Sequence, residues 1–523
     1  MNWVLAINLM IAALAAVAVS LKWLRVAQRE HYIAGWVSRI AGLWLVRRPS
    51  NLVLVPVALV LIAVGAWANI GTNGPVLAYF GIPAALIAAG FFPIGLDIRG
   101  TSSPMNWTPR VRRLLLAYAV IFVGASALLW LVLGVVGVGL VLLAAPLLMD
   151  LALIPMNAIE KRLSNKYLVS ARKRLNQVKP TVVAITGSYG KTSTKGYVGH
   201  VLDGSFAVVA SPASFNNLMG LSRAVNDRVV PGTEVFIAEM GVYGPGEIRE
   251  LSKSFPPDIA AITTIGEAHL ARMGSREVIA AAKAEITEKA RTVVLPIDQP
   301  ELAALAGKCR AEGKTVVTVS TNPSATADVV LDAESGQLTI SQSGGPVTVP
   351  VAVSSVGHAV NIAVAVGIAF ALDVPADKIA AKLGSLPGAQ HRAEIQQTPQ
   401  GVVVIDDTYN SNPVGAERAL EGAAALAEER GGQLVVVTPG MVELGNMQYQ
   451  RNSEFAASVV AHGGRLLAVG RTNRAALRSG AADDSEHPVL VYDRRDVAVK
   501  AALDLAGERG VILYENDLPD HYP

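Results

Sequence analysis

Hydrophobic positions are distributed very unevenly along this chain of 523 residues. Up to about residue 157, long uncharged apolar runs alternate with short segments that are either basic or glycine-containing. Beyond that point, short β-branched runs alternate with longer stretches of mixed polarity. Apolar runs of about 18 residues are long enough for membrane-spanning helices, while alternating strand and helix patterns are typical of α/β domains. The pattern therefore predicts an N-terminal α-helical transmembrane domain at residues 1–157, followed by two α/β domains.

Four apolar runs carry the membrane prediction: residues 3–20, 52–70, 75–96 and 114–149. The last run has 36 uncharged residues and is interrupted by glycines, which fits two helices joined by a turn. Because each crossing needs about 20 apolar residues, we expect five spans, with Asp150 inside the last one. An ionisable residue at that depth is a candidate functional group, although a structural role is the interpretation we favour.

The orientation follows from the segments between the runs. Residues 21–50 carry six Lys or Arg and residues 97–113 carry four, whereas residues 71–74 and the glycine turn carry no charge. Short basic loops stay in the cytoplasm, so we expect a multi-pass plasma-membrane protein with its N-terminus outside and its α/β domains cytoplasmic. Residues 158–179 predict a juxtamembrane amphipathic helix or linker, whose apolar stripe would lie on anionic lipid.

Charge and cysteine content exclude several classes of function. The apolar part has a net charge of +7 and the remainder −4, so the basic excess belongs to the membrane part. A mildly acidic soluble part predicts no nucleic-acid partner. Cys309 is the only cysteine, which excludes an intrachain disulfide scaffold and a zinc ribbon.

The first α/β segment opens with a candidate phosphate-binding loop. A β-branched run at residues 181–185 is followed by TGSYGKTST and then by a helix-compatible stretch. Backbone N–H groups at such a helix N-terminus attract phosphate, the lysine reaches the β- and γ-phosphates, and the hydroxyl after it holds Mg²⁺. The spacing departs from the full P-loop pattern, because Ile185 stands where that pattern has glycine. The residues expected to bind ATP here are Gly187, Ser188, Gly190, Lys191, Thr192 and Ser193.

From residue 180 onward the chain resembles the Mur ligase family, and within it the MurF type, which joins D-alanyl-D-alanine to a UDP-N-acetylmuramoyl tripeptide. The family's motifs occur here in order. They are ITGSYGKTST at 185–194, Asn216-Asn217 with Gly220, EMGVYGPGEI at 239–248, His269-Leu270 with Gly274-Ser275, AKAEI at 282–286, DDTYNSNP at 406–413 and PGMVELG at 439–445. The resemblance implies a central ATP-binding domain at residues 180–388 and a Rossmann-like C-terminal domain at 389–523.

The resemblance also implies a reaction, that of an ATP-dependent, ADP-forming amide ligase of cell-envelope synthesis. ATP activates a carboxylate as an acyl phosphate, and an amine then attacks it. Because every participant in the first step is an anion, the site needs cations around the phosphates. The implied cofactors are ATP, two Mg²⁺ ions and a carbamate derived from CO₂. The implied partners are a cell-wall peptide precursor, a dipeptide amine donor such as D-alanyl-D-alanine, and other envelope-synthesis enzymes.

The family's site residues carry over to matching positions of this chain. Thr192 and Glu239 would share one Mg²⁺, since hard oxygen ligands suit that ion, and His269 would ligate the second. Lys283 would be carbamylated, which turns a cation into a metal-facing anion; an ordinary surface lysine is the alternative. The implied catalytic residues are Lys191, Lys283, His269 and Arg392.

The remaining implied positions surround the nucleotide and the acceptor. Arg392 would reach the γ-phosphate when the two α/β domains close and exclude water. Asn361 would face adenine, although the chain has three steps from His358 to Asn361 where the family usually has four. The other implied contacts are Asp407, Tyr409 and Asn410 on the nucleotide side, and Asn216 and Asn217 on the substrate side.

One departure from the family bears on the acceptor. The soluble ligases carry a domain that binds the UDP group before the phosphate loop, and here only about 21 residues separate that loop from the apolar part. Such a segment is too short for a folded domain. The acceptor is therefore either UDP-linked or lipid-linked, and we favour the lipid-linked form. A membrane-linked ligase of another polymer, of the polyglutamate type, and an ATP-driven transporter remain alternatives.

Overall fold

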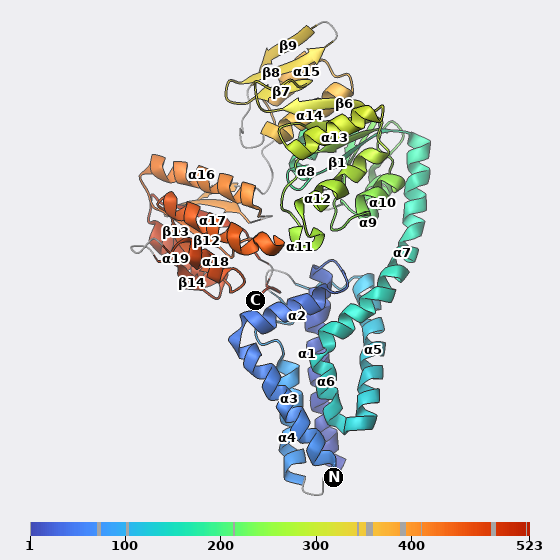
Figure 1. Ribbon diagram of the computed structural model, residues 1–523, viewed down its shortest axis with the longest axis vertical. Helices are drawn as coiled ribbons and strands as arrows, with labels where there is room; N and C mark the ends of the chain where they lie inside the picture. The colour runs from blue at the N-terminus through green and yellow to red at the C-terminus, as the bar shows by residue number, and fades with distance from the viewer. Residues whose placement is uncertain are drawn as a thin grey trace.

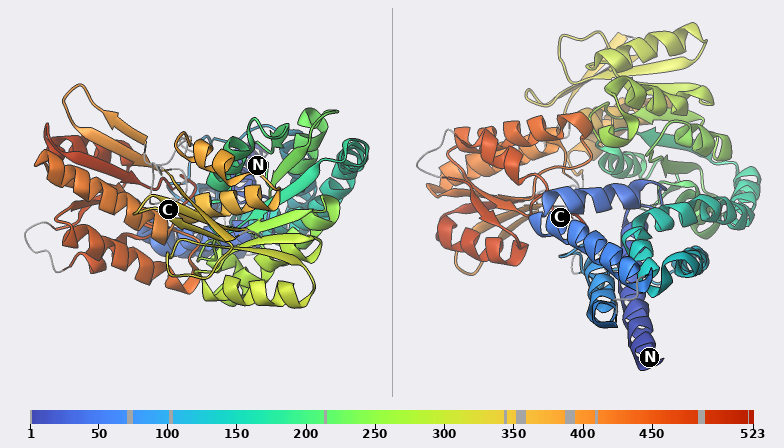
Figure 2. Two further views of the ribbon diagram at one scale, coloured as in Figure 1. Left: turned by 90° about the horizontal axis from the view of Figure 1, so that it is seen from above. Right: turned by 60° about the horizontal axis from the view of Figure 1, so that its bottom comes forward.

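The computed structural model describes residues 2–70, 75–100, 104–212, 215–342, 345–351, 359–386, 394–408, 411–482, 488–518 and 520–523. Three parts are visible in Figure 1: a helical bundle at the bottom, a central α/β domain at the upper right and a C-terminal α/β domain at the left. The N-terminus lies at the far end of the bundle, whereas the C-terminal residues lie beside α2 (Trp36–Arg47) where the three parts meet (Figures 1 and 2).

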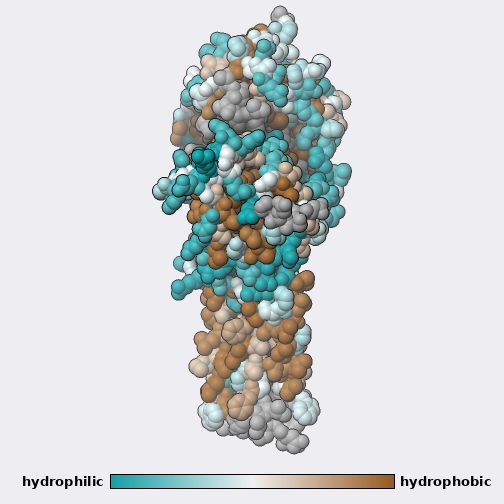
Figure 3. Space-filling view, turned by 90° about the vertical axis from the view of Figure 1, so that its left-hand side faces the viewer, coloured by the Kyte–Doolittle hydropathy of each residue, from teal (hydrophilic) through white to brown (hydrophobic). Residues whose placement is uncertain are grey.

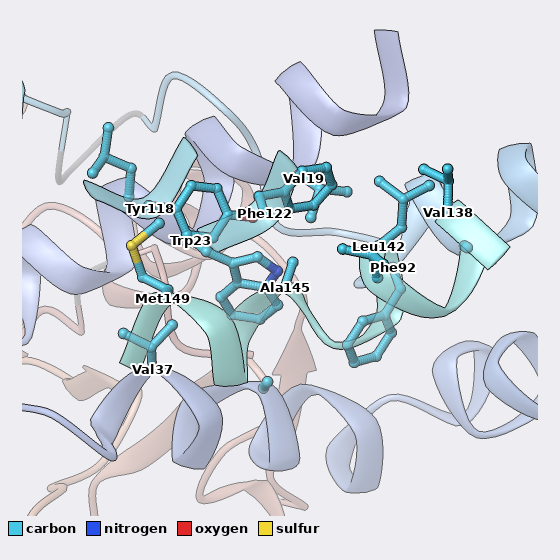
Figure 4. Close-up of a cluster of buried hydrophobic side chains, with 14 of the residues drawn as sticks. Val19, Trp23, Val37, Phe92, Tyr118, Phe122, Val138, Leu142, Ala145 and Met149 are labelled. Carbon is cyan, nitrogen blue, oxygen red and sulfur yellow. The ribbon is translucent and has the colours of Figure 1, made fainter. Parts of the chain in front are cut away.

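The bundle consists of apolar helices around an aromatic core. Trp23, Tyr118 and Phe122 pack there with Phe92 (Figure 4). Its outer surface is also apolar, in contrast to the hydrophilic surface of the α/β domains (Figure 3). The helices are α1 (Asn2–Arg29), α2, α3 (Pro49–Ile70), α4 (Pro75–Phe91), α5 (Pro109–Leu133), η1 (Gly134–Val136), α6 (Gly137–Leu143) and α7 (Ala145–Val178).

Three helical stretches of the described residues are long and apolar enough to cross a membrane, namely Trp3–Arg29, Pro49–Trp67 and Pro109–Leu143. The last stretch contains the predicted glycine turn, because the chain reverses at η1 and α6 packs back against α5. The shorter α4 has 17 residues. Five crossings therefore remain a prediction, while an apolar helical N-terminal region is present.

Asp150 has a structural role. Its carboxylate accepts hydrogen bonds from the backbone N–H groups of Val37 at 3.2 Å and Ser38 at 2.8 Å. These groups belong to the first turn of α2, where an anion satisfies unpaired donors and interacts favourably with the helix dipole. Residues 21–50, which the sequence analysis treated as a connecting segment, therefore contain helix α2, and Asp150 anchors this helix to α7.

Helix α7 links the bundle to the central domain as one continuous helix of 34 residues. The predicted juxtamembrane helix is its second half, and Leu168 and Leu175 of the apolar stripe are buried, together with Ala171, against the central domain beside α9 (Leu218–Arg228). The prediction that this stripe lies on lipid is wrong for Leu168 and Leu175, because the helix leads away from the bundle and protein covers them (Figure 1).

The central domain is built on a sheet of nine described strands in the order β2-β3-β1-β4-β5-β6-β7-β8-β9, parallel as far as β7 and antiparallel thereafter. The predicted strand at 181–185 corresponds to β1, which lies inside the sheet between β3 and β4. The strands are β1 (Thr181–Thr186), β2 (Val208–Ala210), β3 (Val235–Glu239), β4 (Ile259–Ile262), β5 (Thr292–Pro296), β6 (Thr315–Ser320), β7 (Val329–Asp332), β8 (Gln337–Gln342) and β9 (Gly345–Pro350).

Helices cover both faces of this sheet, as the near-continuous hydrophobic character of its strands requires. Helices α8 (Lys191–Leu202) and α14 (Ala359–Ala371) share a core with alternate residues of β1, and α9, α10, α12 and α13 share a core with the others. The further helices are α10 (Glu247–Ser254), α11 (Leu270–Met273), α12 (Arg276–Ala284), η2 (Glu285–Glu288), α13 (Pro300–Ala311) and α15 (Ala376–Leu383).

The C-terminal domain has a second layered α/β arrangement. Its described strands follow the order β10-β11-β15-β12-β13-β14, of which only β10 pairs antiparallel. The strands are β10 (Glu394–Gln397), β11 (Val403–Asp407), β12 (Leu434–Thr438), β13 (Arg465–Val469), β14 (Leu490–Tyr492) and β15 (Val511–Glu515). Helices α16 (Pro413–Arg430), η4 (Gly445–Met447), α17 (Gln448–Ala461), α18 (Arg474–Gly480) and α19 (Arg495–Ala506) complete it. The prediction of two α/β domains is confirmed.

Candidate functional site

The phosphate-binding loop connects β1 to α8, as the sequence predicts. Gly190 precedes α8 with a left-handed φ of 78°, and a Cβ there would lie 2.0 Å from the Asn361 side-chain oxygen. Both conditions require glycine at this position. The Lys191 ammonium donates a hydrogen bond to the Gly187 carbonyl at 2.7 Å, so its charge lies over the loop at the helix N-terminus.

A second segment supports the loop from behind. Ser188 Oγ donates to the Gly266 carbonyl at 3.1 Å and accepts from the Gly266 N–H at 2.8 Å. Thr263 Oγ1 donates to the Tyr189 carbonyl. The segment that follows β4 therefore fixes the shape of the loop, a role that the sequence analysis did not assign to it.

Glu239 is the centre of a buried polar cluster beside the loop. It ends β3 and is 2% exposed. Thr192 Oγ1 donates to its carboxylate at 3.0 Å, and Asn216 Nδ2 donates to the other oxygen at 3.4 Å. The sequence analysis missed Lys195, whose ammonium lies 2.8 Å from Glu239. The four-residue spacing from Lys191 along one helix face was the available signal.

This cluster fits a magnesium site. Mg²⁺ is usually held by one or two carboxylates together with water and substrate phosphates, so Glu239 and the Thr192 hydroxyl supply a suitable pair of hard ligands. The described residues contain no cluster of three or more His, Cys, Asp or Glu that would hold a metal without such a substrate. Asn217, predicted on the substrate side, caps α9 by accepting from the Gly220 N–H at 2.9 Å.

Lys283 lies inside the domain, on α12, with 2% of its surface exposed. Burial, reinforced by the nearby positive charge of Lys191, lowers the pKa of Lys283 well below its usual value. The surface-lysine alternative is therefore wrong. A neutral buried amine close to the phosphate loop is the form that reacts with CO₂, so the environment fits the expected carbamate.

His269 lies at the boundary of the two α/β domains, just before α11. Its Nδ1 is 2.6 Å from Glu443 Oε2, and Arg272 Nη2 is 2.5 Å from the other Glu443 oxygen. Burial alone would raise the pKa of Glu443, but the hydrogen bonds and charges of His269 and Arg272 outweigh it and lower the pKa to about 2. With Nδ1 engaged by a carboxylate, Nε2 is the nitrogen left for a metal. Glu443 belongs to the PGMVELG motif but had no predicted role.

The described part of the C-terminal domain contributes two adjacent carboxyl groups. Asp407 ends β11 and pairs in register with Glu515 of β15. Glu515 is fully buried, and burial raises its pKa to about 7 despite hydrogen bonds from Ser411 and from Thr438, the latter at 2.6 Å. The sequence analysis missed Glu515. The predicted residues Arg392, Tyr409 and Asn410 lie outside the described residues.

The two α/β domains touch directly beside this site. Arg451 of α17 lies 2.5 Å from Glu267, which follows the loop-supporting segment. The Ala271 N–H donates to the Glu443 carbonyl at 2.9 Å. These contacts hold the second domain against the segment that carries His269.

Comparisons with known proteins agree with this geometry. Residues 185–369 match the model of the Mur ligase middle domain, and residues 391–514 match that of the Mur ligase glutamate ligase domain. Together the two matches span more than half of the chain.

Curated relatives extend the match. The UDP-N-acetylmuramoyl-tripeptide–D-alanyl-D-alanine ligase of Mycobacterium tuberculosis is 34% identical over 48% of this chain and 50% of the relative. The enzyme of the same name from Bacillus subtilis is 33% identical over 55% of this chain and 62% of the relative. The chain therefore spans about half to two thirds of the length of these relatives.

Solved structures match at the level of the fold. MurF from Acinetobacter baumannii aligns with a TM-score of 0.57 and 24% identity, covering 68% of this chain and 77% of that chain. The MurF ligase of Thermotoga maritima, solved in complex with ADP, aligns with a TM-score of 0.55 and 24% identity, covering 68% and 80%.

Proposed function

The chain belongs to the Mur ligase family, and we propose that it is an ATP-dependent ligase that joins a carboxylate to an amine through an acyl phosphate, releasing ADP and phosphate. The observation that carries this proposal is the convergence of Lys191, the Thr192–Glu239 pair and the buried Lys283 around one glycine loop. The reaction is most like the addition of D-alanyl-D-alanine to a muramyl tripeptide, since the curated relatives are named for that activity.

The residues of the loop divide the work of charge neutralisation. Lys191 and the N-terminus of α8 bind the β- and γ-phosphate oxygens of ATP. Thr192 and Glu239 hold Mg²⁺, which when bound neutralises phosphate charge. Lys195 keeps the buried Glu239 carboxylate paired when that ion is absent.

His269 and Lys283 serve the second half of the site. His269 offers Nε2 to a second Mg²⁺, with Glu443 orienting the ring. Lys283, carried as a carbamate, supplies an anion in place of a buried neutral amine beside Lys191. Asn361, which contacts the loop at Gly190, and Asp407 complete the nucleotide side together with Arg392, Tyr409 and Asn410.

We further propose that the enzyme is an integral protein of the plasma membrane, with its N-terminus outside and its catalytic domains in the cytoplasm. The apolar surface of the bundle supports insertion in the membrane (Figure 3), and the alternation of basic and uncharged segments supports the orientation. Its amide products would then serve cell-envelope synthesis at the inner membrane face.

The acceptor that suits this placement is lipid-linked. A cavity of about 820 Å³ lies between α1, α4 and the segment after α4, with apolar walls that include Leu14, Ala18 and Ile87. Lys22 and Arg99, together with Asp97, line its end nearest the α/β domains. Such a groove has room for the hydrocarbon of the lipid carrier and basic groups for its phosphate, and the membrane would hold this acceptor at high effective concentration.

The test is a competition in nanodiscs between UDP-linked and lipid-linked muramyl tripeptide, each with ATP and D-alanyl-D-alanine. We expect a higher kcat/KM for the lipid-linked form, and we expect Ala18→Trp, which fills the groove, to remove that preference. Ala13→Trp on an exposed position of the same helix is the matched control. A preference of the unmodified protein for the UDP-linked form would reject the lipid-linked acceptor. ATP turnover that forms no amide with either acceptor would reject the ligase itself.

A further inference from the structure

One carboxylate joins all three parts of the molecule. Glu30 follows α1 and is 2% exposed. Its Oε2 accepts from Arg272 of the central domain at 3.1 Å. Its Oε1 lies 2.9 Å from His521 Nε2 and accepts from the Tyr522 hydroxyl at 3.2 Å. The bundle therefore meets both the central domain and the C-terminal segment at a single buried anion.

Arg272 carries this contact toward the site. Its side chain is 5% exposed and lies over the rings of Trp36, at 4.1 Å, and Tyr243, at 5.1 Å. Its Nη2 bonds both Glu30 and Glu443, whereas its Nε and Nη1 are buried without a hydrogen-bond partner among the described residues. The two carboxylates are therefore what holds this guanidinium, and loss of either would leave a buried charge poorly compensated.

The same carboxylate of Glu443 holds His269. A chain of ionic contacts, buried at Glu30 and Arg272 and partly buried at Glu443 and His269, thus runs to Nδ1 of His269. Interactions of this kind are strong in a protein interior and fix the geometry of their members together.

An aromatic route runs beside the ionic one. His31, the next residue of the bundle, stacks on Tyr243 with ring centroids 4.9 Å apart. Tyr243 in turn meets His269 edge to face at 5.0 Å. A second set of contacts therefore connects the end of α1 to the same imidazole, and it touches the first where Arg272 lies over Tyr243.

We propose that the membrane bundle is a positioning element of the active site, in which Glu30 and Arg272 orient His269 through Glu443. The role of His269 as a metal ligand rests on the proposed function, whereas the dependence of its position on the bundle goes beyond it. Outer-shell partners of a metal-binding histidine commonly change metal affinity by about 10- to 100-fold when they are removed.

The experiment measures Mn²⁺ binding by electron paramagnetic resonance, using the full chain in nanodiscs with a non-hydrolysable ATP analogue. We expect Glu30→Gln to weaken one class of bound Mn²⁺ by about 10- to 100-fold. The affinity for the analogue at saturating metal should stay within about twofold, because Lys191 and Thr192 are not part of the network. Glu160→Gln, which breaks the pair with Arg113 between α7 and α5, is the matched control and should leave Mn²⁺ binding unchanged.

Arg272→Lys provides a second variant, since it keeps the charge but loses the planar guanidinium whose Nη2 contacts both carboxylates and whose face lies over Trp36. It should lower the affinity of the same class of bound Mn²⁺. The test therefore stays decisive if Glu30→Gln does not fold. Wild-type Mn²⁺ binding in a folded Glu30→Gln or Arg272→Lys protein would overturn the proposal. Because the measurement needs neither acceptor nor product, it separates this inference from the failure of the ligase function.

Discussion

Replacing Lys195 by methionine tests whether Glu239 occupies a cation site. The substitution keeps the length of the side chain but removes the ammonium that lies 2.8 Å from the carboxylate, in a pair whose side chains are 7% and 3% exposed. Breaking a buried ion pair from one side costs about 3–5 kcal/mol, because the partner stays buried and charged. Hydrogen bonds from Thr192 and Asn216 remain and together offset about 1 kcal/mol of this cost, at the lower end of the usual range because the Asn216 contact is 3.4 Å long. We therefore expect a loss of about 2–4 kcal/mol in the stability of the central domain.

The assay is amide hydrogen exchange, read by mass spectrometry on peptides that cover β1 and β3. All seven tryptophans lie in the first 130 residues, so tryptophan fluorescence would report on the bundle instead. A loss of about 2–4 kcal/mol corresponds to exchange that is roughly 30- to 1,000-fold faster for amides that exchange through opening of the domain.

Adding Mg²⁺ with ATP should slow exchange more in Lys195→Met than in the unmodified protein, since the metal replaces the missing positive charge. Lys195→Met combined with Glu239→Gln is the control and should exchange more slowly than Lys195→Met alone. Unchanged exchange in Lys195→Met, or an equal response to Mg²⁺ and ATP in both proteins, would refute the reasoning.

Three further outcomes are expected. Lys283→Ala should lower kcat by several powers of ten, and added short carboxylic acids should partly restore it by occupying the position of the carbamate; near-full activity without them would exclude that group. With Cys309 replaced, a cysteine at Thr72 should react with an impermeant thiol reagent in intact cells, whereas one at Ser102 should not; both positions lie outside the described residues. The reverse labelling would invert the proposed topology. Glu515 has a folded-state pKa of about 7, above its unfolded value, so its contribution to stability is complete below about pH 4.5 and is lost as the pH rises through 7. The shift corresponds to about 3 kcal/mol, and hydrogen exchange of β15 should therefore accelerate between pH 5 and 8, after correction for the intrinsic rate, in the unmodified protein but not in Glu515→Gln. Equal pH dependence in the two proteins would remove Glu515 as the cause.

Local patterns in the sequence were sufficient for much of the fold and for the centre of the site. The β-branched run before the glycine loop, and the apolar run that ends in Glu239, specify neighbouring parallel strands, so their ends meet at one edge of the sheet. Thr192 and Glu239 were predicted to share one Mg²⁺ from the family resemblance, and this strand arrangement brings the Thr192 hydroxyl to 3.0 Å from the Glu239 carboxylate.

The residues that were missed depend on contacts that no local pattern encodes. Arg272 and Glu30 are 242 positions apart, and their pairing exists only because the bundle docks beside α11. Glu515 is unremarkable as a sequence position and becomes protonatable near neutral pH only through complete burial. The composition of the apolar stripe of α7 does not show whether lipid or protein covers it. The uninterrupted continuation of the helix beside the central domain places protein against the stripe.

The fate of the acceptor's carboxylate oxygens tests the central claim most directly. A muramyl tripeptide labelled with ¹⁸O in the reacting carboxylate is incubated with the protein, ATP and D-alanyl-D-alanine, and the released phosphate is analysed by mass spectrometry. An acyl phosphate intermediate transfers one labelled oxygen to phosphate for each amide formed, and we expect this ratio to be one. Phosphate that carries no label while ATP is consumed would show that ATP is simply hydrolysed, and would contradict the assignment of this chain as an amide ligase.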